Sequence, residues 1–427
     1  MGLSRPSSRW NSSSERYSHS PPPTSLTPSS PSFDSGSGNV TTTCRSCRAS
    51  PDVCESSYGT SSLLSNVETF WRTLYLDLLG HGYMLRPRYK PDWHPSWWQS
   101  GKDPKYCEDG LPPEHHAVID AQRVSDGKTV AIKVVDKLVN PYEVEIASSL
   151  GRKELVHLPE NHCVPILDVL SGPNDSDRAL LVMPFLARYN HPPFETVGEV
   201  VDFFHQLFEG VQYMHHNIVV HRDITALNIM MDPSPIWPEL FHPSAPWMSR
   251  DLKHKAKHRS RTSHPTKYYL TDFGVARKCR PVNQQSLDEL LEGTGAVTPG
   301  SQQSSQLSDP FSVDVLQLGS FIFERFLQVY EGLGFMEDLV FDMLNEEHCE
   351  RPTMEVVISR FDGILRGLAT SALRKRLRPR GERVSVKCFR DIQHACRSAW
   401  YIVRGYPAIP TLAPESKGKK MERAFHS

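Results

Sequence analysis

The stretch that decides the fold is His221-Arg222-Asp223-Ile224-Thr225-Ala226-Leu227-Asn228, which is followed further along the chain by Asp272-Phe273-Gly274. The gap of five residues between Asp223 and Asn228 lets one short loop present a base and a metal ligand to the same phosphate group. Asp272 would add a carboxylate that holds magnesium beside nucleotide phosphates. Either motif alone could arise by chance. Both in this order, after an upstream Val130-Ala131-Ile132-Lys133, indicate phosphoryl transfer from a nucleotide.

The bulk composition is that of one large or two ordinary domains. The chain has 427 residues, and its 48 Lys and Arg nearly balance 49 Asp and Glu, so the net charge argues for neither a nucleic-acid nor a membrane partner. No apolar stretch approaches the roughly 18 residues of a membrane-spanning helix, and the N-terminal residues lack the apolar core of a signal peptide. Nine scattered cysteines are typical of a reducing compartment. We therefore expect an intracellular protein of the cytoplasm or nucleus.

Residues 1–62 are dominated by Ser, Pro, Thr and Gly, a composition that cannot bury enough apolar surface to fold, so we expect a disordered tail. Within it Cys44 and Cys47, with Cys54 nearby, have the spacing of half a zinc site. No second Cys or His pair follows at a suitable distance, so free thiols are the better interpretation. From residue 63, apolar residues at helical spacing and then an aromatic cluster predict a helix and an extended arm over 63–104.

Residues 105–186 have the pattern of a strand-rich lobe. A hairpin is predicted with strands at 116–123 and 128–135, followed by a short helix at 141–150 and further strands at 164–170 and 179–186. From Val197 onward the periodicity is helical, and one long helix reaching Met214 leads into the His221 loop. Strands first and helices afterwards predict an α+β, two-lobed fold, with a small β-rich N-lobe at 105–186 and a larger helical C-lobe at 187–370.

Two basic segments stand out. Asn228 and Asp272 are further apart than adjoining catalytic loops need, so an insertion is expected at about 233–268, and its part 250–267 carries seven Lys or Arg and three His. A surface excursion is the plain interpretation, and a docking patch for an acidic partner is the alternative. The second run, at 374–380, begins a basic C-terminal extension at 371–427 and would be either a solvated helix end or a nuclear import signal.

Taken together, the motifs resemble those of a eukaryotic protein kinase domain, and in finer detail those of the fungal-type protein kinases. The resemblance covers about residues 65–365. The phrases behind the closer match are Gly82-Tyr83-Met84-Leu85-Arg86-Pro87-Arg88-Tyr89, Asn161-His162-Cys163-Val164-Pro165, Val182-Met183-Pro184, Pro192-Pro193-Phe194-Glu195-Thr196-Val197 and Tyr268-Tyr269-Leu270-Thr271-Asp272-Phe273-Gly274.

This resemblance implies a two-lobed enzyme that uses ATP and Mg²⁺ to phosphorylate a protein hydroxyl. Asp223 would accept the proton of the incoming hydroxyl, and Asn228 and Asp272 would hold the metal. Lys133 would contact the α- and β-phosphates and pair with a glutamate of the following helix. Glu143 fits best, because the apolar residues three, four and seven positions later place it beside the buried face of that helix; Glu145 is the alternative.

The resemblance also implies an adenine pocket. Val118 and Ala131 would lie above the base and Met230 below it. Met183 would sit at the back, before a hinge formed by Pro184, Phe185 and Leu186, whose backbone would hydrogen-bond the adenine edge. In the C-lobe, Asp314 matches a buried carboxylate that supports the catalytic loop, and Arg351 matches a late structural arginine. These two residues favour a protein kinase over a small-molecule phosphotransferase.

The chain departs from the kinase pattern at several positions. Counting back from Lys133, the three expected glycines of a phosphate-covering loop fall at Leu111, Pro113 and His116, and proline has no N–H to donate. The expected lysine two residues after Asp223 is Thr225, and the alternative arginine four residues after it is Leu227, so a cation near the transferring phosphate is missing.

The activation segment departs as well. Pro299-Gly300 stands where Pro-Glu is expected, so Arg351 loses its usual carboxylate, and another carboxylate or solvent must serve it. Thr294, Thr298 and Ser301 are candidate phosphosites there. The resulting expectation is a protein kinase acting on Ser or Thr rather than Tyr. The alternatives are a pseudokinase scaffold and a small-molecule phosphotransferase.

Overall fold

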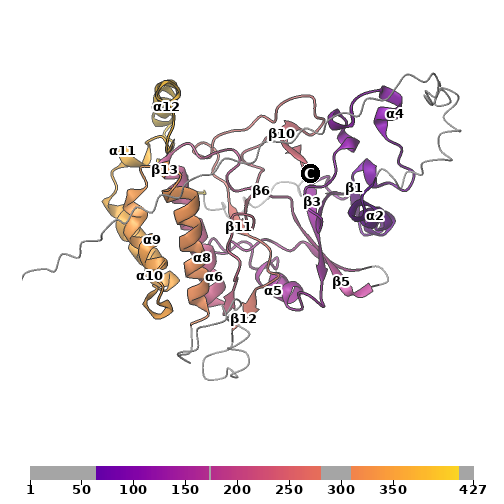
Figure 1. The fold of residues 1–427 in the computed structure, drawn as a ribbon, viewed down its shortest axis with the longest axis horizontal. Coiled ribbons are helices and arrows are strands. Elements are labelled where there is room, and N and C mark those ends of the chain that lie inside the picture. The colour runs from indigo at the N-terminus through magenta and orange to yellow at the C-terminus, as the bar shows by residue number, and fades with distance from the viewer. Residues whose placement is uncertain (1–63, 173–174, 280–308, 413–427) are drawn as a thin grey trace, which may run out of the picture. The chain divides into compact units, whose positions relative to one another are not determined.

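The computed structural model describes residues 64–172, 175–279 and 309–412 (Figure 1). The expectations for residues 1–62, for the Cys44 and Cys47 pair and for Gly300 and the candidate phosphosites at 294–301 lie outside these described residues. Within them, the predicted α+β, two-lobed architecture is confirmed. A β-rich N-lobe and a mainly helical C-lobe are visible side by side in Figure 1.

The N-lobe is built on a five-stranded antiparallel sheet of order β1-β2-β3-β5-β4. The predicted hairpin is β2 and β3, which turn at Gly127 with a positive φ of 69°. The predicted strand at 164–170 is shorter than expected, because the N–H of Val164 donates to Leu270 and that of Ile166 to Gly151 instead of joining the sheet. The strands are β1 (Tyr83–Leu85), β2 (Val118–Arg123), β3 (Thr129–Asp136), β4 (Asp168–Gly172) and β5 (Asp175–Pro184).

The predicted N-terminal helix is two helices, α2 (Asn66–Thr73) and α3 (Tyr75–Gly80). A capping box starts α2, since the side chain of Ser65 accepts from the N–H of Glu68 and the Glu68 side chain accepts from the N–H of Ser65. Trp71 and Leu78 are fully buried against the strand residues of one sheet face, in a core separate from that of the C-lobe. The helices therefore cover one face of the sheet. The other face, with Lys133, is turned toward Asp272, and we call this boundary between the two lobes the cleft.

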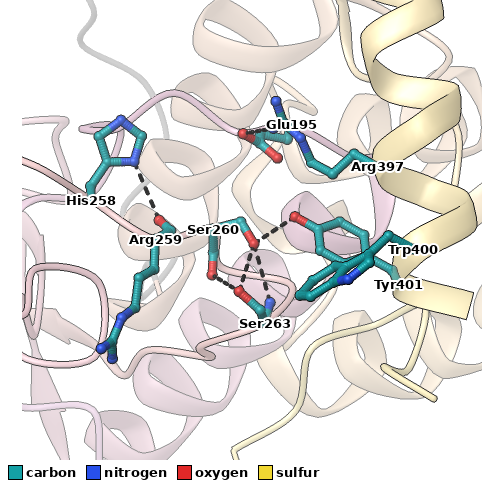
Figure 2. Close-up of a pocket in the computed structure, with 8 residues that line it drawn as sticks. All are labelled: Glu195, His258, Arg259, Ser260, Ser263, Arg397, Trp400 and Tyr401. Carbon is teal, nitrogen blue, oxygen red and sulfur yellow. Dashed lines mark hydrogen bonds and ion pairs between the residues drawn. The ribbon is translucent and has the colours of Figure 1, made fainter. Parts of the chain in front are cut away.

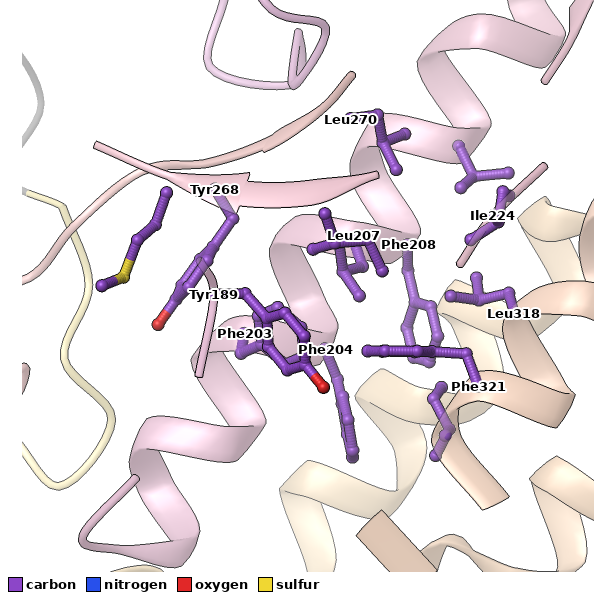
Figure 3. Packing of buried hydrophobic residues seen from close by; sticks show 14 of the residues in the cluster. Tyr189, Phe203, Phe204, Leu207, Phe208, Ile224, Tyr268, Leu270, Leu318 and Phe321 are labelled. Carbon is purple, nitrogen blue, oxygen red and sulfur yellow. The ribbon is translucent and has the colours of Figure 1, made fainter. Parts of the chain in front are cut away.

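The C-lobe is organised around α6 (Val197–His216), which Thr196 caps by accepting from the N–H of Glu199. Aromatic side chains pack along this helix, and Tyr189 stacks on Phe203 with ring centroids 5.2 Å apart (Figure 3). Phe321 of α8 (Phe311–Ile322) joins the same cluster. The other C-lobe helices are α9 (Glu337–Met343), α10 (Met354–Gly367), α11 (Thr370–Leu373) and α12 (Val384–Val403), and α5 (Glu143–Leu150) lies in the N-lobe.

Short strands complete the cleft side of the C-lobe. A three-stranded sheet has the order β11-β8-β6, and β7 pairs with β12 beside the catalytic loop. Within the ranges that the structure describes, no helix is both long and apolar enough to cross a bilayer. The bounds are β6 (Ala187–Arg188), β7 (Val219–Val220), β8 (Ile229–Met231), β9 (Phe241–His242), β10 (Ala245–Ser249), β11 (Tyr268–Leu270), β12 (Arg277–Lys278), β13 (Tyr330–Glu331) and β14 (Arg378–Pro379).

The insertion between β8 and β11 is only partly the surface excursion that was expected. Trp237 and Phe241 are buried, and β9 pairs with β10. Arg261, from the basic run, is also buried: its guanidinium donates to the hydroxyl of Tyr268 and the carbonyl of Tyr189. The expectation is wrong for these residues because the insertion packs its apolar side chains on the hinge region.

The basic run at 374–380 is not a solvated helix end. Leu373 and Leu377 are buried, and β14 within the run pairs with β13. The guanidinium of Arg376 forms ion pairs with Glu382 and Asp391. The run is therefore held in the fold, since Leu377 within it and Leu373 just before it belong to the C-lobe core and its charges are partly neutralised.

Candidate functional site

Lys133 lies at the centre of a charged cluster in the cleft. Its Nζ is 2.5 Å from Oε1 of Glu143 and 2.7 Å from Oδ1 of Asp272. Lys133 comes from β3, Glu143 from the start of α5 and Asp272 from the segment after β11, so the fold brings together side chains that are far apart in the sequence. The ion pair with Glu143 is present as expected, whereas Glu145 pairs with Lys278 at 2.6 Å.

The cluster sets the charge of its members. Burial alone would lower the pKa of Lys133, but the two carboxylates outweigh it and raise that pKa. Burial likewise would raise the pKa of Asp272, but the Lys133 ammonium outweighs it and lowers that pKa. For Glu143, burial prevails over the attraction of Lys133, and the pKa is raised. Lys133 is thus a fixed cation at the position where phosphate oxygens would lie.

Asp223 and Asn228 face each other across the catalytic loop. Nδ2 of Asn228 donates to Oδ2 of Asp223 at 2.7 Å and to its backbone oxygen at 2.9 Å. The loop is joined to the Asp272 segment, because the N–H of Thr271 donates to the backbone oxygen of Asn228 at 2.9 Å. Asp272 itself has a positive φ of 64°, which turns its carboxylate toward Lys133.

The donor set suits magnesium. The amide nitrogen of Asn228 is engaged with Asp223, so its side-chain oxygen is the atom that can face a cation. Asp272 uses Oδ1 for Lys133 and for the N–H of Gly274, and its side chain is 46% exposed. One amide and one carboxylate oxygen, with water and phosphate oxygens completing the shell, are the ligands that Mg²⁺ prefers.

Asp314, on α8, fixes the backbone of the catalytic loop through hydrogen bonds. Its carboxylate, fully buried, accepts from the N–H of His221 at 2.9 Å and of Arg222 at 2.8 Å, and Nε2 of His215 is 3.0 Å away. Gln317, one helical turn later, donates to the carbonyl of Arg222 and accepts from the N–H of Ile224. Sequence reasoning expected Asp314 but missed Gln317; its place three residues after Asp314, on the same helix face, was the available signal.

Three of the residues expected around adenine, Val118, Ala131 and Met183, lie on one face of the N-lobe sheet. In the strand register Val118 is opposite Lys133 and Ala131 is opposite Met183, so these side chains share one face. Phe185 and Leu186 follow β5, and Met230 lies between two fully buried neighbours of β8. Asp120, opposite Ala131, lies on the same sheet face, where the sequence predicted only apolar residues around adenine.

Arg86 pairs with Asp120. Its Nε lies 3.1 Å from Oδ1 of Asp120, at ion-pair distance without hydrogen-bond alignment, and both side chains are buried. Burial would lower the pKa of Arg86, but Asp120 outweighs it and raises that pKa. The sheet face that we expect to contact adenine therefore carries a buried ion pair in addition to its apolar residues.

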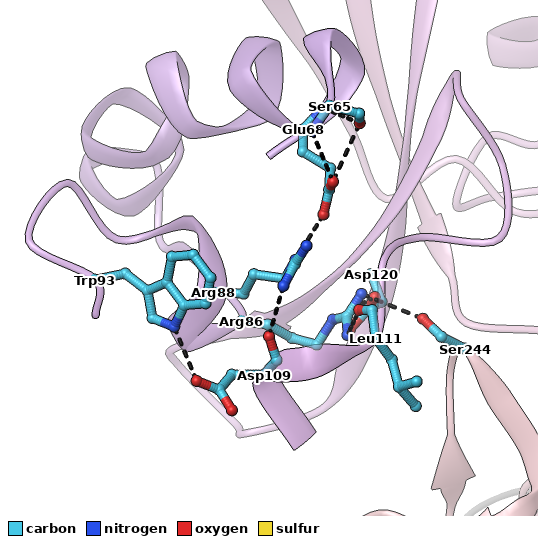
Figure 4. A network of polar contacts seen from close by, with 9 residues as sticks. All are labelled: Ser65, Glu68, Arg86, Arg88, Trp93, Asp109, Leu111, Asp120 and Ser244. Carbon is cyan, nitrogen blue, oxygen red and sulfur yellow. Dashed lines mark hydrogen bonds and ion pairs between the residues drawn. The ribbon is translucent and has the colours of Figure 1, made fainter. Parts of the chain in front are cut away.

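A folded segment replaces the glycine-rich loop. β1 and β2 are joined by residues 86–117, which contain α4 (Ser96–Ser100) and short turns of 3₁₀ helix. Asp109 organises this connection: it accepts from Trp93 and from Ser96, and its carbonyl accepts from Arg88 at 2.8 Å (Figure 4). Leu111, Pro113 and His116, at the expected glycine positions, lie in the loop that follows.

This connection meets the insertion on the hinge side of the cleft. Arg86 donates to Oγ of Ser244, and Phe241 packs on Phe185 of the hinge. Oε1 of Glu108 is 3.8 Å from Nε2 of His242, whose pKa burial lowers to about 4, so this contact is not an ion pair at neutral pH. The hinge side of the cleft is bridged by two segments that ordinary kinase motifs do not include.

The structure also shows the surroundings of the residues that depart from the kinase pattern in the C-lobe. Thr225 and Leu227 are both exposed on the catalytic loop. Arg351, which we expected to be served by another carboxylate or by solvent, is partly exposed and donates to three backbone carbonyls, those of Asn345, Ser312 and Glu346. Among the described residues, carbonyls and solvent satisfy this guanidinium, and no carboxylate pairs with it.

Comparison with known proteins agrees with this geometry. Two relatives are "SNF1-related protein kinase catalytic subunit alpha KIN12" of Arabidopsis thaliana, 27% identical over 128 residues, and "NUAK family SNF1-like kinase 2" of Rattus norvegicus, 29% identical over 127 residues. Each match covers 26% of this chain, and 24% and 18% of the two relatives. The model of the protein kinase domain matches residues 115–328, half of the chain. The chain therefore belongs to the protein kinase domain family.

Proposed function

We propose that this chain is an active protein kinase that transfers the γ-phosphate of ATP to a serine or threonine hydroxyl. The observation that carries the proposal is the chain of contacts that joins Lys133 of the N-lobe through Asp272 and its neighbour Thr271 to Asn228 and Asp223 of the C-lobe. Asp223 would orient the hydroxyl and receive its proton, and Lys133 would hold the phosphates. Bound Mg²⁺, held by Asn228 and Asp272, would neutralise charge that develops on the phosphate oxygens.

The first test is transfer of labelled γ-phosphate from magnesium ATP to a mixed protein pool. Asp223→Asn removes the carboxylate base and is expected to reduce transfer by roughly 10²–10⁴-fold. Asp338→Asn, on an exposed carboxylate of α9, is the matched control and is expected to keep full activity. Equal transfer by the parent and Asp223→Asn, with both folded by circular dichroism, would contradict the proposal.

The acceptor and the subgroup are further parts of the proposal. Phosphoamino-acid analysis of the labelled product is expected to give phosphoserine or phosphothreonine, and phosphotyrosine alone would contradict that choice. We also place the chain in the fungal-type group of kinases. The phrases around residues 82–89, 161–165 and 192–197 support this placement, and the first of them lies outside the region that the general kinase model matches.

A pseudokinase scaffold is the second candidate, and one observation favours it. The folded connection 86–117 offers no glycine-rich backbone to cradle phosphates and contacts the insertion across the hinge side. Under this alternative magnesium ATP would not raise the melting temperature, and partner binding would survive Asp272→Ala. A rise in melting temperature that Asp272→Ala abolishes would favour the kinase.

A further inference from the structure

Helix α12 lies at the edge of the C-lobe, beyond α11 (Figure 1). One face is docked on the domain: Asp391 pairs with Arg376, His394 contacts the carbonyl of Arg374, and the hydroxyl of Tyr401 donates to Ser260 at 2.6 Å. Tyr401 is the buried residue of this helix. These contacts determine which face of the helix points away from the protein.

The outward face is apolar along the helix. Its residues recur at intervals of three and four, so they form one stripe, and no charged residue interrupts it. Phe389 is 63% exposed and Ile392 66%. A continuous exposed apolar surface of this length indicates an interaction site rather than scattered surface residues. The α12 stripe consists of Phe389, Ile392, Cys396, Ala399, Ile402 and Val403.

Positive charge runs along one edge of the α12 stripe. Arg390, Arg397 and Arg404 are spaced seven residues apart and so form one row. Arg390 is paired with Glu382 and Arg397 with Glu195, so their charge is partly neutralised. Arg404 lies over the ring of Trp400, 5.4 Å from its centroid, and has no acidic partner within the described ranges. Trp400, about half exposed, lies between the stripe and this row. Its indole ring has a large apolar surface and one polar N–H, so it suits a boundary between apolar and polar surroundings.

Beyond the arginine row is a cavity of about 330 Å³ between α12 and the insertion (Figure 2). Its lining includes the hydroxyls of Ser260 and Ser263 and the side chains of Arg259, Arg397 and Trp400. Glu195, the acid of this lining, is paired with Arg397. The two serine hydroxyls are hydrogen-bonded to each other and to their neighbours. Arg259 is exposed and has no acidic partner among the residues described, so its guanidinium is the group that the cavity offers to an anion.

The same part of the chain has an excess of positive charge. Residues 371–427 contain fourteen Lys or Arg and four Asp or Glu, although the whole chain has 48 and 49. The rest of the chain is therefore acidic. A charge asymmetry of this kind indicates an anionic partner for the basic segment.

We propose that the α12 stripe and the adjoining basic cavity bind the surface of a bilayer that contains anionic phospholipid. The stripe would enter the acyl boundary, Trp400 would lie at headgroup level, and the arginine row and cavity would contact lipid phosphates. A second copy of this chain would bring the same excess of positive charge to the contact, so the charges favour lipid. This inference goes beyond the proposed kinase activity and does not depend on it. It differs from the expectation, based on net charge alone, that the chain has no membrane partner.

The test is co-sedimentation of the full chain with vesicles of phosphatidylcholine alone and of equimolar phosphatidylcholine and phosphatidylserine. We expect binding to the anionic vesicles, little binding to the neutral ones, and a loss of binding as salt rises. Ile392→Glu is expected to reduce the bound fraction by roughly tenfold or more. Leu76→Glu is the matched control, because Leu76 is 67% exposed and lies on α3 of the N-lobe. It is expected to bind like the parent.

Three results would overturn the proposal. The first is no binding of the parent to anionic vesicles. The second is binding that Ile392→Glu and Leu76→Glu leave equally intact, which would mean that the stripe does not insert. The third is a dimer by light scattering that Ile392→Glu dissociates, which would mean that a second copy covers the stripe. Unchanged thermal unfolding of both variants shows that neither result comes from misfolding.

Discussion

At the scale of single residues, the charged side chains that are buried or partly buried in this fold differ in the neighbours that stabilise their charge. Asp314 is fully buried yet accepts from two backbone N–H groups and contacts His215, so its carboxylate is compensated. Arg351 is served by carbonyls, with no carboxylate partner in the part of the chain that the structure describes. Asp202, on α6, differs from both. It is buried, and its carboxylate accepts a hydrogen bond from the neutral side-chain amide of Gln206 at 2.9 Å.

Asp202 is expected to make stability depend on pH. Burial raises its pKa to about 8, above the roughly 3.9 of an unfolded chain. Between these values the native state binds the extra proton, so the free energy of unfolding falls as pH rises through this window. Asp202→Asn is expected to be more stable than the parent at pH near 8, and this gain should shrink toward pH near 5. Urea unfolding at the two pH values measures it.

The control for that experiment is Asp338→Asn, on an exposed position of α9. It is expected to leave stability unchanged at both pH values. A gain for Asp202→Asn that is the same at both pH values would contradict the assignment, since a titrating carboxyl must produce a difference that varies with pH.

At the scale of elements, the connection between β1 and β2 is the feature that separates this chain from the ordinary kinase pattern. It is tied to the N-terminal helices by Arg88, whose Nε donates to Oε1 of Glu68 at 2.6 Å with both side chains buried. The same Glu68 completes the capping box of α2. One carboxylate thus links the start of a helix to the segment that replaces the glycine-rich loop.

Breaking this link is expected to destabilise the N-lobe. Arg88→Met leaves Glu68 buried without its counter-charge, which should cost about 3–5 kcal/mol in urea unfolding. Adding Glu68→Gln to Arg88→Met removes the buried charge and should recover part of that loss. The recovery is incomplete because Arg88 also donates to Asp109. Simple additivity of the two single changes would argue that the residues do not interact.

At the scale of the whole molecule, the described part of the C-terminal extension, residues 371–412, is part of the C-lobe and not a separate tail. The N–H of Leu377 donates to the carbonyl of Glu195, and that of Val197 donates to Lys375, so the extension is bonded to the start of α6. Leu373 and Leu377 join the same hydrophobic core as α6 and α8. The position of α12, and hence of the stripe, depends on this docking.

Leu377→Ala is therefore expected to lower the free energy of unfolding of the full chain by about 2–5 kcal/mol, because it leaves a cavity in the C-lobe core. Leu76→Ala, at an exposed leucine of α3, should change it by less than about 0.5 kcal/mol. Chemical denaturation compares the two variants. An unchanged value for Leu377→Ala would show that the extension is not part of the cooperative fold.

The sequence by itself determined what depends on short spacing. The loop from His221 to Asn228, the Asp272 motif, the β2–β3 hairpin and the long helix α6 follow from neighbours a few residues apart, through turn chemistry and periodicity. Asp314 could be anticipated too, because the resemblance to kinases assigned its role.

Only the tertiary structure decided what depends on contacts between distant segments. Arg86 meets Ser244 across 158 positions of sequence, and Lys133 meets Asp272 across 139. The basic runs were misjudged for the same reason: composition describes their charge, but Arg261 and Leu377 are buried by partners that local patterns do not reveal. Burial is a property of the packed chain, because the apolar and polar groups that surround a residue come from elements that fold against it from elsewhere.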